Sequence, residues 1–279
     1  MNSMPLLLNS NREEIGSITD FTSADKIALP AVKVSVQAIL LQMAAEKEFG
    51  GGHHDRLDAF TITMSHPDGM AALRAKQEVT AHFTASPIQN LELQNEGVHT
   101  VLNSYDILGG PATFNVVWAS ARFKEENPLI YQAFIETLED AISLINSDTE
   151  AAVDTYVRLS GDASTPELVR RIITDPQVHY TTMPSNIGKY LDFMTRIGTL
   201  KQEGVTWQDV FFFSRMSTTS READPGGAAK QVPRLLIGGR DDDCTPDLFG
   251  IRGMFGHQAS RHQVQGLPAS AAAQVRKLA

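Results

Sequence analysis

The chain has 279 residues, a hydrophobic content of 42% and a formal net charge of −9 at pH 7. This length and apolar content are sufficient for one large or two ordinary globular domains. No apolar run approaches the ~20 residues of a membrane span, and a single cysteine excludes an internal disulfide and a cysteine-rich metal cluster.

The N-terminal segment lacks the features of a signal peptide. It has no basic start, and its apolar run at residues 6–8 is too short for the hydrophobic region of such a peptide. From the sequence as it stands we expect no export, and a cytoplasmic location if the start is genuine.

Two strand-loop-helix units open the regular part of the chain. Residues 26–29 predict a short strand, and residues 35–49 predict a helix with a serine cap. Residues 59–64 have the composition of a buried strand, residues 65–69 that of a polar turn, and residues 70–76 are good helix formers. Two such units in succession predict a parallel sheet, in which ligands bind at the carboxyl ends of the strands.

The pattern continues to residue 213 and becomes mainly helical. We expect strands at residues 78–83, 98–104 and 113–119, and a short helix at residues 86–95. The remaining expected elements are helices at residues 128–145, 151–159, 166–173 and 186–200, and a terminal strand or docking segment at residues 207–213.

The last part of the chain differs from the rest. Residues 1–213 hold 15 Lys and Arg against 27 Asp and Glu, a net charge of −12, whereas residues 214–279 hold 9 against 6, a net charge of +3. Periodicity is lost there, and we expect a disordered tail. Its basic residues are diluted by acids and form no amphipathic stripe, so no nucleic-acid or membrane partner is expected.

The start of the helix at residues 35–49 is a candidate anion site. Ser35 and the amides of Val36 and Gln37 stand where a helix follows a strand, and the helix dipole there favours a sulfonate, carboxylate or phosphate. Lys33 is a candidate counter-charge in the same loop. The alternative is a plain N-cap and a solvated lysine.

Four further residues are candidate ligand contacts. His66 and Asp68 lie in the second strand-end loop, where a histidine can donate to a solute and an aspartate can order the loop; the alternative is an ordinary turn closed by Pro67 and Gly69. Ser86 follows a third strand, as an anion contact or a cap. Tyr105 precedes two glycines, as a cleft aromatic or a core tyrosine.

No sequence motif supports catalysis, a cofactor or a metal. The pair His53 and His54 lacks the spacing of a metal site, and the run at residues 241–244 is taken as incidental. There is no nucleophile elbow, phosphate-cradling glycine loop or zinc-binding histidine motif. We therefore expect a binding protein rather than an enzyme.

Four ordered blocks resemble a known family. They are Lys26-Ile-Ala-Leu-Pro-Ala-Val-Lys-Val-Ser-Val-Gln, Met64-Ser-His-Pro-Asp-Gly-Met-Ala-Ala-Leu, Phe83-Thr-Ala-Ser-Pro-Ile-Gln and Asn103-Ser-Tyr-Asp-Ile-Leu-Gly-Gly-Pro. Together they are similar to the substrate-binding proteins of ABC importers, in the nitrate, sulfonate and taurine group, which is close to the proteins that bind thiamine pyrimidine precursors. The similarity runs from about residue 4 to residue 213.

The resemblance implies an α/β fold of the periplasmic-binding-protein type II, with two lobes, two crossovers and the solute in the cleft. It implies a partial first-lobe segment or connector at residues 1–25, a second lobe at residues 26–102, and a crossover and the remaining first lobe at residues 103–213. The first lobe is then incomplete, the chain is truncated at its N-terminus, and residues 214–279 are an unrelated tail.

The function implied is a periplasmic, monomeric solute-binding component of an ABC importer. It takes a small anionic or zwitterionic organic solute, without catalysis, and presents it to a membrane permease. Three alternatives remain open: binding or synthesis of a thiamine pyrimidine precursor on the same fold, a truncated fragment that does not bind, and a ligand-sensing regulatory domain.

Overall fold

The computed structural model describes residues 1–162, 164–213 and 235–239. Its main sheet has five strands, in the spatial order β4 (Thr61–Thr63), β3 (Ile27–Leu29), β5 (Ala81–Thr84), β2 (Leu7–Ser10) and β6 (His99–Asn103). Strand β3 is parallel to β4 and β5, whereas β2 is antiparallel to β5 and β6. The parallel strands predicted from the sequence are therefore present, together with one antiparallel strand.

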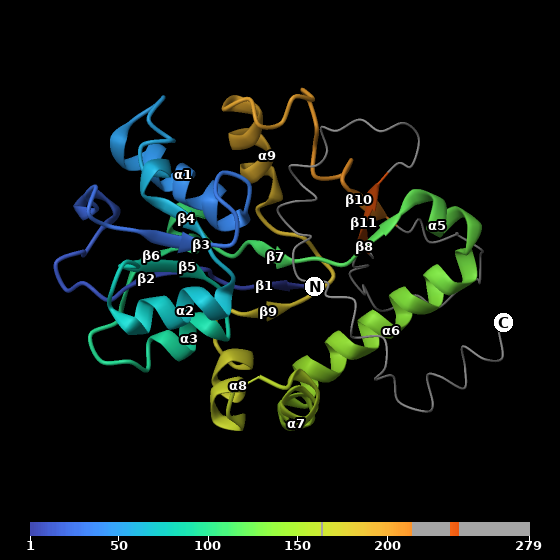
Figure 1. Cartoon of the computed structure of the whole chain (residues 1–279). Helices are drawn as coiled ribbons and strands as arrows, with labels where there is room; N and C mark the ends of the chain where they lie inside the picture. The colour runs from blue at the N-terminus through green and yellow to red at the C-terminus, as the bar shows by residue number, and fades with distance from the viewer. Residues whose placement is uncertain (163, 214–234, 240–279) are drawn as a thin grey trace.

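Helices cover both faces of this sheet. Helix α1 (Val36–Phe49) lies on one face, and α2 (His66–Ala75) and α3 (Ile88–Glu92) lie on the other (Figure 1). Side chains alternate between the faces along a strand. Thus Ile27 and Leu29 belong to the core cluster that contains α1, whereas Ala28 packs with Leu73 of α2. Both faces are buried, which is why these strands are continuously apolar.

Strand β2 was not among the predicted elements, because residues 1–25 were assigned to a partial first-lobe segment or connector. Strand β2 lies inside the main sheet, where Leu8 is opposite Phe83 of β5 and Leu102 of β6. The sequence interpretation considered only parallel strand-loop-helix units, so it had no place for an antiparallel strand. Leu8 is fully buried. A central strand removes more apolar surface from water than an edge strand does, and this stabilises a run of leucines most.

Helix α2 begins earlier than predicted. Residues 65–69 were expected to form a turn, but α2 starts at His66 because the hydroxyl oxygen of Ser65 accepts from the backbone N–H of Asp68 at 3.3 Å. Pro67 is compatible with the first turn of a helix. A backbone N–H at that position has no acceptor within the helix, so the lack of one in proline costs no hydrogen bond. Residues 59 and 60, predicted as the start of a strand, belong instead to the 3₁₀ helix η2 (Asp58–Phe60).

Three short strands connect this sheet to the rest of the molecule. Strand β1 (Asn2–Ser3) lies between β7 (Thr113–Asn115) and β9 (His179–Tyr180) (Figure 1). The single strand predicted at residues 113–119 is in fact two, because the chain leaves β7 and continues as β8 (Trp118–Ser120) in another sheet. We refer to β1, β7, β9 and helix α4 (Ser104–Leu108) as the crossover.

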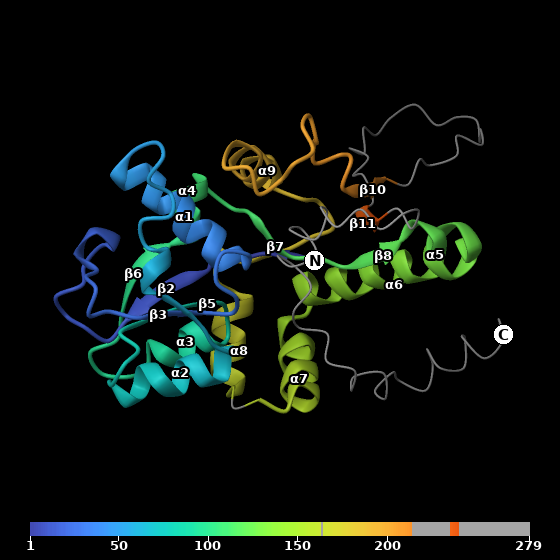
Figure 2. The same ribbon diagram turned by 45° about the horizontal axis from the view of Figure 1, so that its top comes forward.

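The remaining part is mostly helical, as predicted. Its elements are α5 (Ala121–Glu126), α6 (Pro128–Ser147), α7 (Thr149–Ser160), α8 (Pro166–Ile173), α9 (Ile187–Arg196), β10 (Phe211–Phe213) and β11 (Leu235–Gly239), and a further 3₁₀ helix, η1 (Ile18–Asp20), precedes β3. Strand β11 lies between β8 and β10. Helix α9 returns to pack on α1, and α6 extends away from the main sheet (Figure 2).

The predicted disordered tail falls mostly outside the described residues. Of residues 214–279 the structure describes only Leu235–Gly239, and this segment forms strand β11, antiparallel to β10 and parallel to β8. The expectation of disorder is not met for these five residues. For the rest of the tail it remains a prediction.

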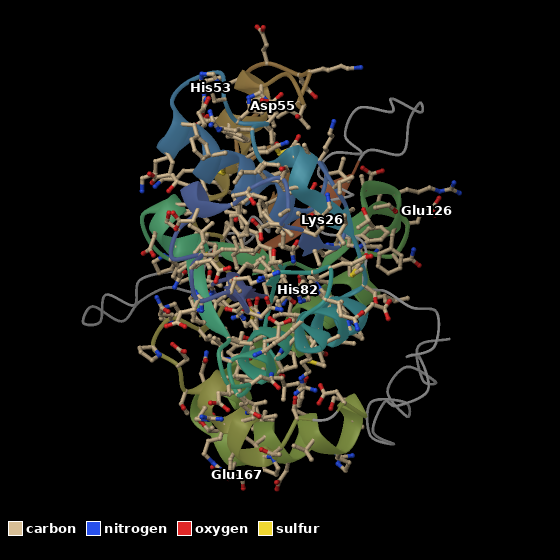
Figure 3. The ribbon with its side chains drawn as sticks, turned by 60° about the vertical axis from the view of Figure 1, so that its left-hand side comes forward. Lys26, His53, Asp55, His82, Glu126 and Glu167 are labelled. Carbon is tan, nitrogen blue, oxygen red and sulfur yellow. The ribbon has the colours of Figure 1, made fainter. Side chains whose placement is uncertain are left out.

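A buried polar cluster lies beneath α2 and α3. His82 Nδ1 is 2.5 Å from Glu92 Oε1, and Asn9 Nδ2 donates to Glu92 Oε2 at 3.0 Å; all three residues are fully buried. His82 lies among the packed side chains in the middle of the view, whereas His53 lies at the outer end (Figure 3). A Cβ added to Gly69 would be 2.6 Å from His82 Nε2, so α2 approaches the ring at its glycine.

Gly69→Ala should destabilise the protein by roughly 1–3 kcal/mol, because the new methyl group overlaps a ring that Glu92 holds in place. Urea unfolding measures the change. The matched control is Gly188→Ala in α9, where a Cβ meets nothing within 4 Å; it should be neutral or stabilise by up to about 1 kcal/mol. Equal effects of the two substitutions would contradict this account of the α2 packing.

Candidate functional site

The carboxyl ends of three parallel strands gather the candidate residues at one edge of the main sheet. Leu29 of β3 is paired with Thr63 of β4, and β5 runs parallel beside them. Each strand is followed by a helix: α1 after β3, α2 after β4 and α3 after β5. Leu7, at the start of β2, is opposite Thr84 at this same edge, and β1 precedes it by only a few residues. The crossover therefore adjoins the strand ends.

At the start of α1 the structure leaves hydrogen-bond donors unused. The hydroxyl oxygen of Ser35 accepts from the N–H of Ala38 at 3.2 Å, as a cap. The backbone N–H groups of Val36 and Gln37 have no acceptor among the described residues, although the two residues are only 2% and 3% exposed. Lys33 lies in the loop before α1 and has a left-handed backbone conformation, with a φ of 68°. Its ammonium group is exposed and makes no ion pair with a described residue.

His66 occupies the first turn of α2, not the loop that the sequence predicted. Its Nδ1 lies 2.7 Å from the hydroxyl oxygen of Thr84 at the end of β5. Burial, and secondarily the nearby His82, lower the pKa of His66 to about 4. The imidazole is consequently neutral at pH 7, and it can exchange hydrogen bonds with a solute but offers no positive charge.

Asp68 has a structural role in the same turn. Its carboxylate oxygen accepts from the hydroxyl of Ser65 at 2.6 Å, while the backbone N–H of Asp68 donates to that hydroxyl oxygen. A carboxylate in the first turn is favoured by the helix dipole. The start of α2 thus already carries a negative charge, which makes it a poorer anion site than the start of α1.

Ser86 and Tyr105 line two different cavities. Ser86 accepts from Gln89 Nε2 at 3.1 Å and lines a cavity of about 270 Å³. Tyr105 is 6% exposed, donates its hydroxyl to the carbonyl of Gln177 at 2.9 Å and lines a cavity of about 530 Å³. Burial raises the pKa of Tyr105 to about 12, so the phenol stays protonated and fastens α4 to the segment before β9.

The candidate residues share an edge of the sheet, but they do not all line either of the two cavities described above. Neither of these two cavities is lined by Ser35, His66 or Asp68, and Gln177 is the residue common to both. Because Ser35, His66 and Ser86 each follow a strand of one sheet, the sequence predicts that their side chains converge on one cleft that faces Tyr105, and this stays a prediction.

Sequence reasoning missed residues that hold this edge together. Gln89 accepts from the N–H of Leu7 at 2.9 Å and donates to the carbonyl of Pro5 at 3.0 Å, which fixes β2 against α3. Asn103 caps α4 through the N–H of Tyr105. Only Asn103, a polar residue directly after an apolar strand and before a helix start, carried a sequence signal that could have indicated its role.

Two features are absent from the described part of the chain. Residues 1–162, 164–213 and 235–239 contain no group of three or more His, Cys, Asp or Glu side chains that could hold a metal ion. No helix within these ranges is long and apolar enough to cross a membrane.

Comparison with known proteins finds matches by structure and none by sequence. No family model and no curated protein match the chain. The periplasmic aliphatic sulphonate binding protein SsuA from Escherichia coli superposes with a TM-score of 0.52 at 15% identity, over 72% of this chain and 69% of that one. A ligand-binding component of an ABC-type import system from Staphylococcus aureus, crystallised with zinc, superposes with a TM-score of 0.50 at 14% identity, over 71% and 65%.

These superpositions establish the fold class. The chain has the α/β fold of the periplasmic binding proteins of type II, as the sequence predicted. It spans 65% of the second of these structures, slightly under two thirds. At such low identity the likeness extends to the fold and not to the ligand.

The depressed pKa of His66 predicts a specific pH dependence of stability. The unfolded histidine takes up its proton near pH 6.5 and the folded one only near pH 4. The unfolded state therefore binds more protons between these values, and stability is lost as the pH falls from 6.5 towards 4. His66 should account for a loss of roughly 2 kcal/mol between pH 7 and pH 5.

Urea unfolding at the two pH values tests this. His66→Gln should reduce the loss on acidification by roughly that amount, while His53→Gln, in an exposed loop, should keep the wild-type pH dependence. The interpretation is wrong if the two variants lose equal stability between pH 7 and pH 5.

Proposed function

We propose that this chain is a solute-binding component of an ABC importer that holds a small organic anion or zwitterion without catalysis. The proposed solutes carry a sulfonate, as taurine does, or a similar nitrate-like oxyanion group. The proposed site comprises Ser35, Val36, Gln37, His66, Asp68, Ser86 and Tyr105. The proposed partner is a membrane permease, which the chain serves as a monomer in the periplasm.

The fold supports a binding role. Both structural neighbours are named as ligand-binding proteins, one for aliphatic sulphonates and one of an ABC-type import system. In open α/β sheets, ligands bind outside the carboxyl ends of the strands. Here those ends carry the starts of α1 and α2 and lie beside the crossover, which is where a solute held between two parts of the molecule would contact both.

The start of α1 carries the proposal for an anion. Two backbone N–H groups in buried residues, Val36 and Gln37, lack acceptors among the described residues, and the N-terminal end of a helix has a partial positive charge. The hydroxyl oxygen of Ser35 accepts from the N–H of Ala38, and its O–H has no acceptor among the described residues, so it is free to donate. An oxyanion of the solute would satisfy all three donors.

Lys33 and Asp68 determine which helix start takes the anion. The unpaired ammonium of Lys33 lies in the loop that leads into α1, whereas the carboxylate of Asp68 already neutralises the start of α2. The neutral ring of His66 adds a hydrogen-bonding group without adding charge. These charges favour the binding of one oxyanion group of the solute at the start of α1. The same solute can carry an ammonium group at another position.

The crossover supplies the proposed hinge. Binding would bring the helical part towards the strand ends by small changes in the residues around β1, β7 and β9, as in other two-lobed binding proteins. The closed form would then be the one presented to the permease.

Ser35→Ala tests the anion site. The substitution should weaken the binding of isethionate or taurine about fivefold, the equivalent of the roughly 1 kcal/mol of one hydrogen bond. Isothermal titration calorimetry measures the affinity, and urea unfolding reports the separate loss of the cap, also about 1 kcal/mol.

The matched control is Ser120→Ala. Ser120 caps α5 through the N–H of Phe123 at 3.0 Å, away from the strand ends, so its loss should lower stability and leave the affinity unchanged. Affinity equal to wild type in Ser35→Ala would remove Ser35 from the site. Failure of every anionic probe to bind the wild-type chain would overturn the proposed function.

A further inference from the structure

We propose that helix α2 is a pH-sensitive element of this fold: it separates from the main sheet as a local unit while the rest of the protein stays folded, and mild acid favours the separated form. We call the two states of α2 the closed form, which the structure shows, and the open form. Helix α2 lies on the outside of the main sheet beside α3, and no described helix covers it in either view (Figures 1 and 2).

Few buried side chains hold α2 in the closed form. Of its ten residues only Gly69 and Leu73 are buried, whereas α1 buries nine of its fourteen. Leu73 packs in a small cluster with Ala28 and Val79, separate from the cluster that contains α1. Segments with few buried apolar contacts open at a lower free-energy cost than the whole molecule unfolds. The main core can therefore persist when α2 opens.

The position of His66 makes the closed form sensitive to pH. His66 is the first residue of α2, it is half-buried, and its Nδ1 lies 2.7 Å from the hydroxyl oxygen of Thr84. The ring centroids of His66 and His82 are 5.6 Å apart. A positive charge at the start of a helix is opposed by the helix dipole, and burial removes the water that would solvate it. A protonated His66 is thus less stable in the closed form than in the open form.

No carboxylate of a described residue forms an ion pair with His66. Helix α2 packs against α3, β5 and β3. The carboxylate of Glu92, on α3, is 2.5 Å from His82 of β5, and that of Asp68, on α2 itself, accepts from a serine hydroxyl in its own turn. The remaining ionisable residue of these elements is Arg74, in the last turn of α2, and β3 has none. The closed form therefore has no opposite charge that would stabilise a protonated His66.

The packing of His82 beneath α2 also favours opening. His82 Nε2 is buried and has no hydrogen-bond partner among the described residues. Gly69 lies against it, because a Cβ added to Gly69 would be 2.6 Å from this nitrogen. A buried polar atom without a partner costs free energy, and water can reach the ring once α2 has left. This cost in the closed form lowers the free energy of opening.

The size of the effect follows from the proton uptake of His66. Burial, and secondarily the nearby His82, lower the pKa of His66 from 6.5 to about 4 in the closed form. The open form regains the ordinary value, so it binds more protons than the closed form between these two limits. The closed form therefore loses stability as the pH falls from 6.5 towards 4. Between pH 7 and pH 5 the ratio of open to closed molecules rises about twentyfold.

Opening of α2 has a consequence for the candidate site. His66 and Asp68 leave the strand-end edge with the helix, and β4, at the end of the main sheet, loses the helix that follows it. Mild acid would then act on the solute site through the protein rather than through the solute. This consequence rests on the proposed function. The opening itself depends on no solute and is tested without one.

Native-state hydrogen exchange of the full chain, with no solute added, tests the opening. At pH 7 the backbone N–H groups of residues 70–75 should be less protected than those of α1. Their exchange should be insensitive to low concentrations of urea, because a local opening exposes little surface. After correction for the intrinsic exchange rate, their protection should fall about twentyfold from pH 7 to pH 5. Equal protection and equal urea dependence of α1 and α2 at both pH values would overturn the proposal, because α2 would then open only with the whole molecule.

Three variants control the assignment. His66→Gln, which keeps a hydrogen-bonding group near Thr84, should make the protection of α2 the same at pH 7 and pH 5. His53→Gln should keep the wild-type fall. Ala71→Gly, at an exposed position of α2, should lower the protection of α2 about fivefold at both pH values. The proposal also fails if His66→Gln keeps the wild-type fall, or if Ala71→Gly leaves the protection of α2 unchanged.

Discussion

The insertion of β2 between β5 and β6 is the constraint on which the rest of the structure depends. Its entry segment is pinned on both sides: the N–H of Leu6 donates to the hydroxyl oxygen of Ser104 at 2.9 Å, and the N–H of Leu7 donates to Gln89 Oε1 at 2.9 Å. Ser104 N–H returns a bond to the carbonyl of Leu6 at 3.0 Å. Because β1 immediately precedes this segment, these bonds hold the crossover against the strand ends.

The same strand also anchors the polar interior. Asn9 of β2 reaches Glu92 of α3, which in turn holds His82 of β5. Removing one partner of a buried hydrogen bond typically costs about 1–3 kcal/mol, because the other polar group is then left unsatisfied. The cluster thereby fixes α3 and, through the close approach of Gly69 to the ring, α2. The positions of His66 and Ser86 at the strand ends follow from these two helices.

The chemical preference of the start of α1 arises from which groups the fold has already satisfied. At the start of α1 the acceptors are used and the donors of Val36 and Gln37 remain, beside the positive charge of Lys33. Net charge or residue type alone does not show this preference, because a hydroxyl can serve as either donor or acceptor.

The sequence by itself determined the elements with strong local signals and the order in which they come. Helix α8 has the bounds that the pattern predicts, and Ser35 caps α1, because the apolar spacing of a helix and the chemistry of its cap are local. Tertiary structure decided the rest. The role of Leu8 depends on partners some 75 and 95 residues away in the sequence, Phe83 and Leu102. Long-range strand pairing of this kind cannot be read from the hydrophobic pattern of the sequence. A strand has the same local pattern whichever strand it is paired with.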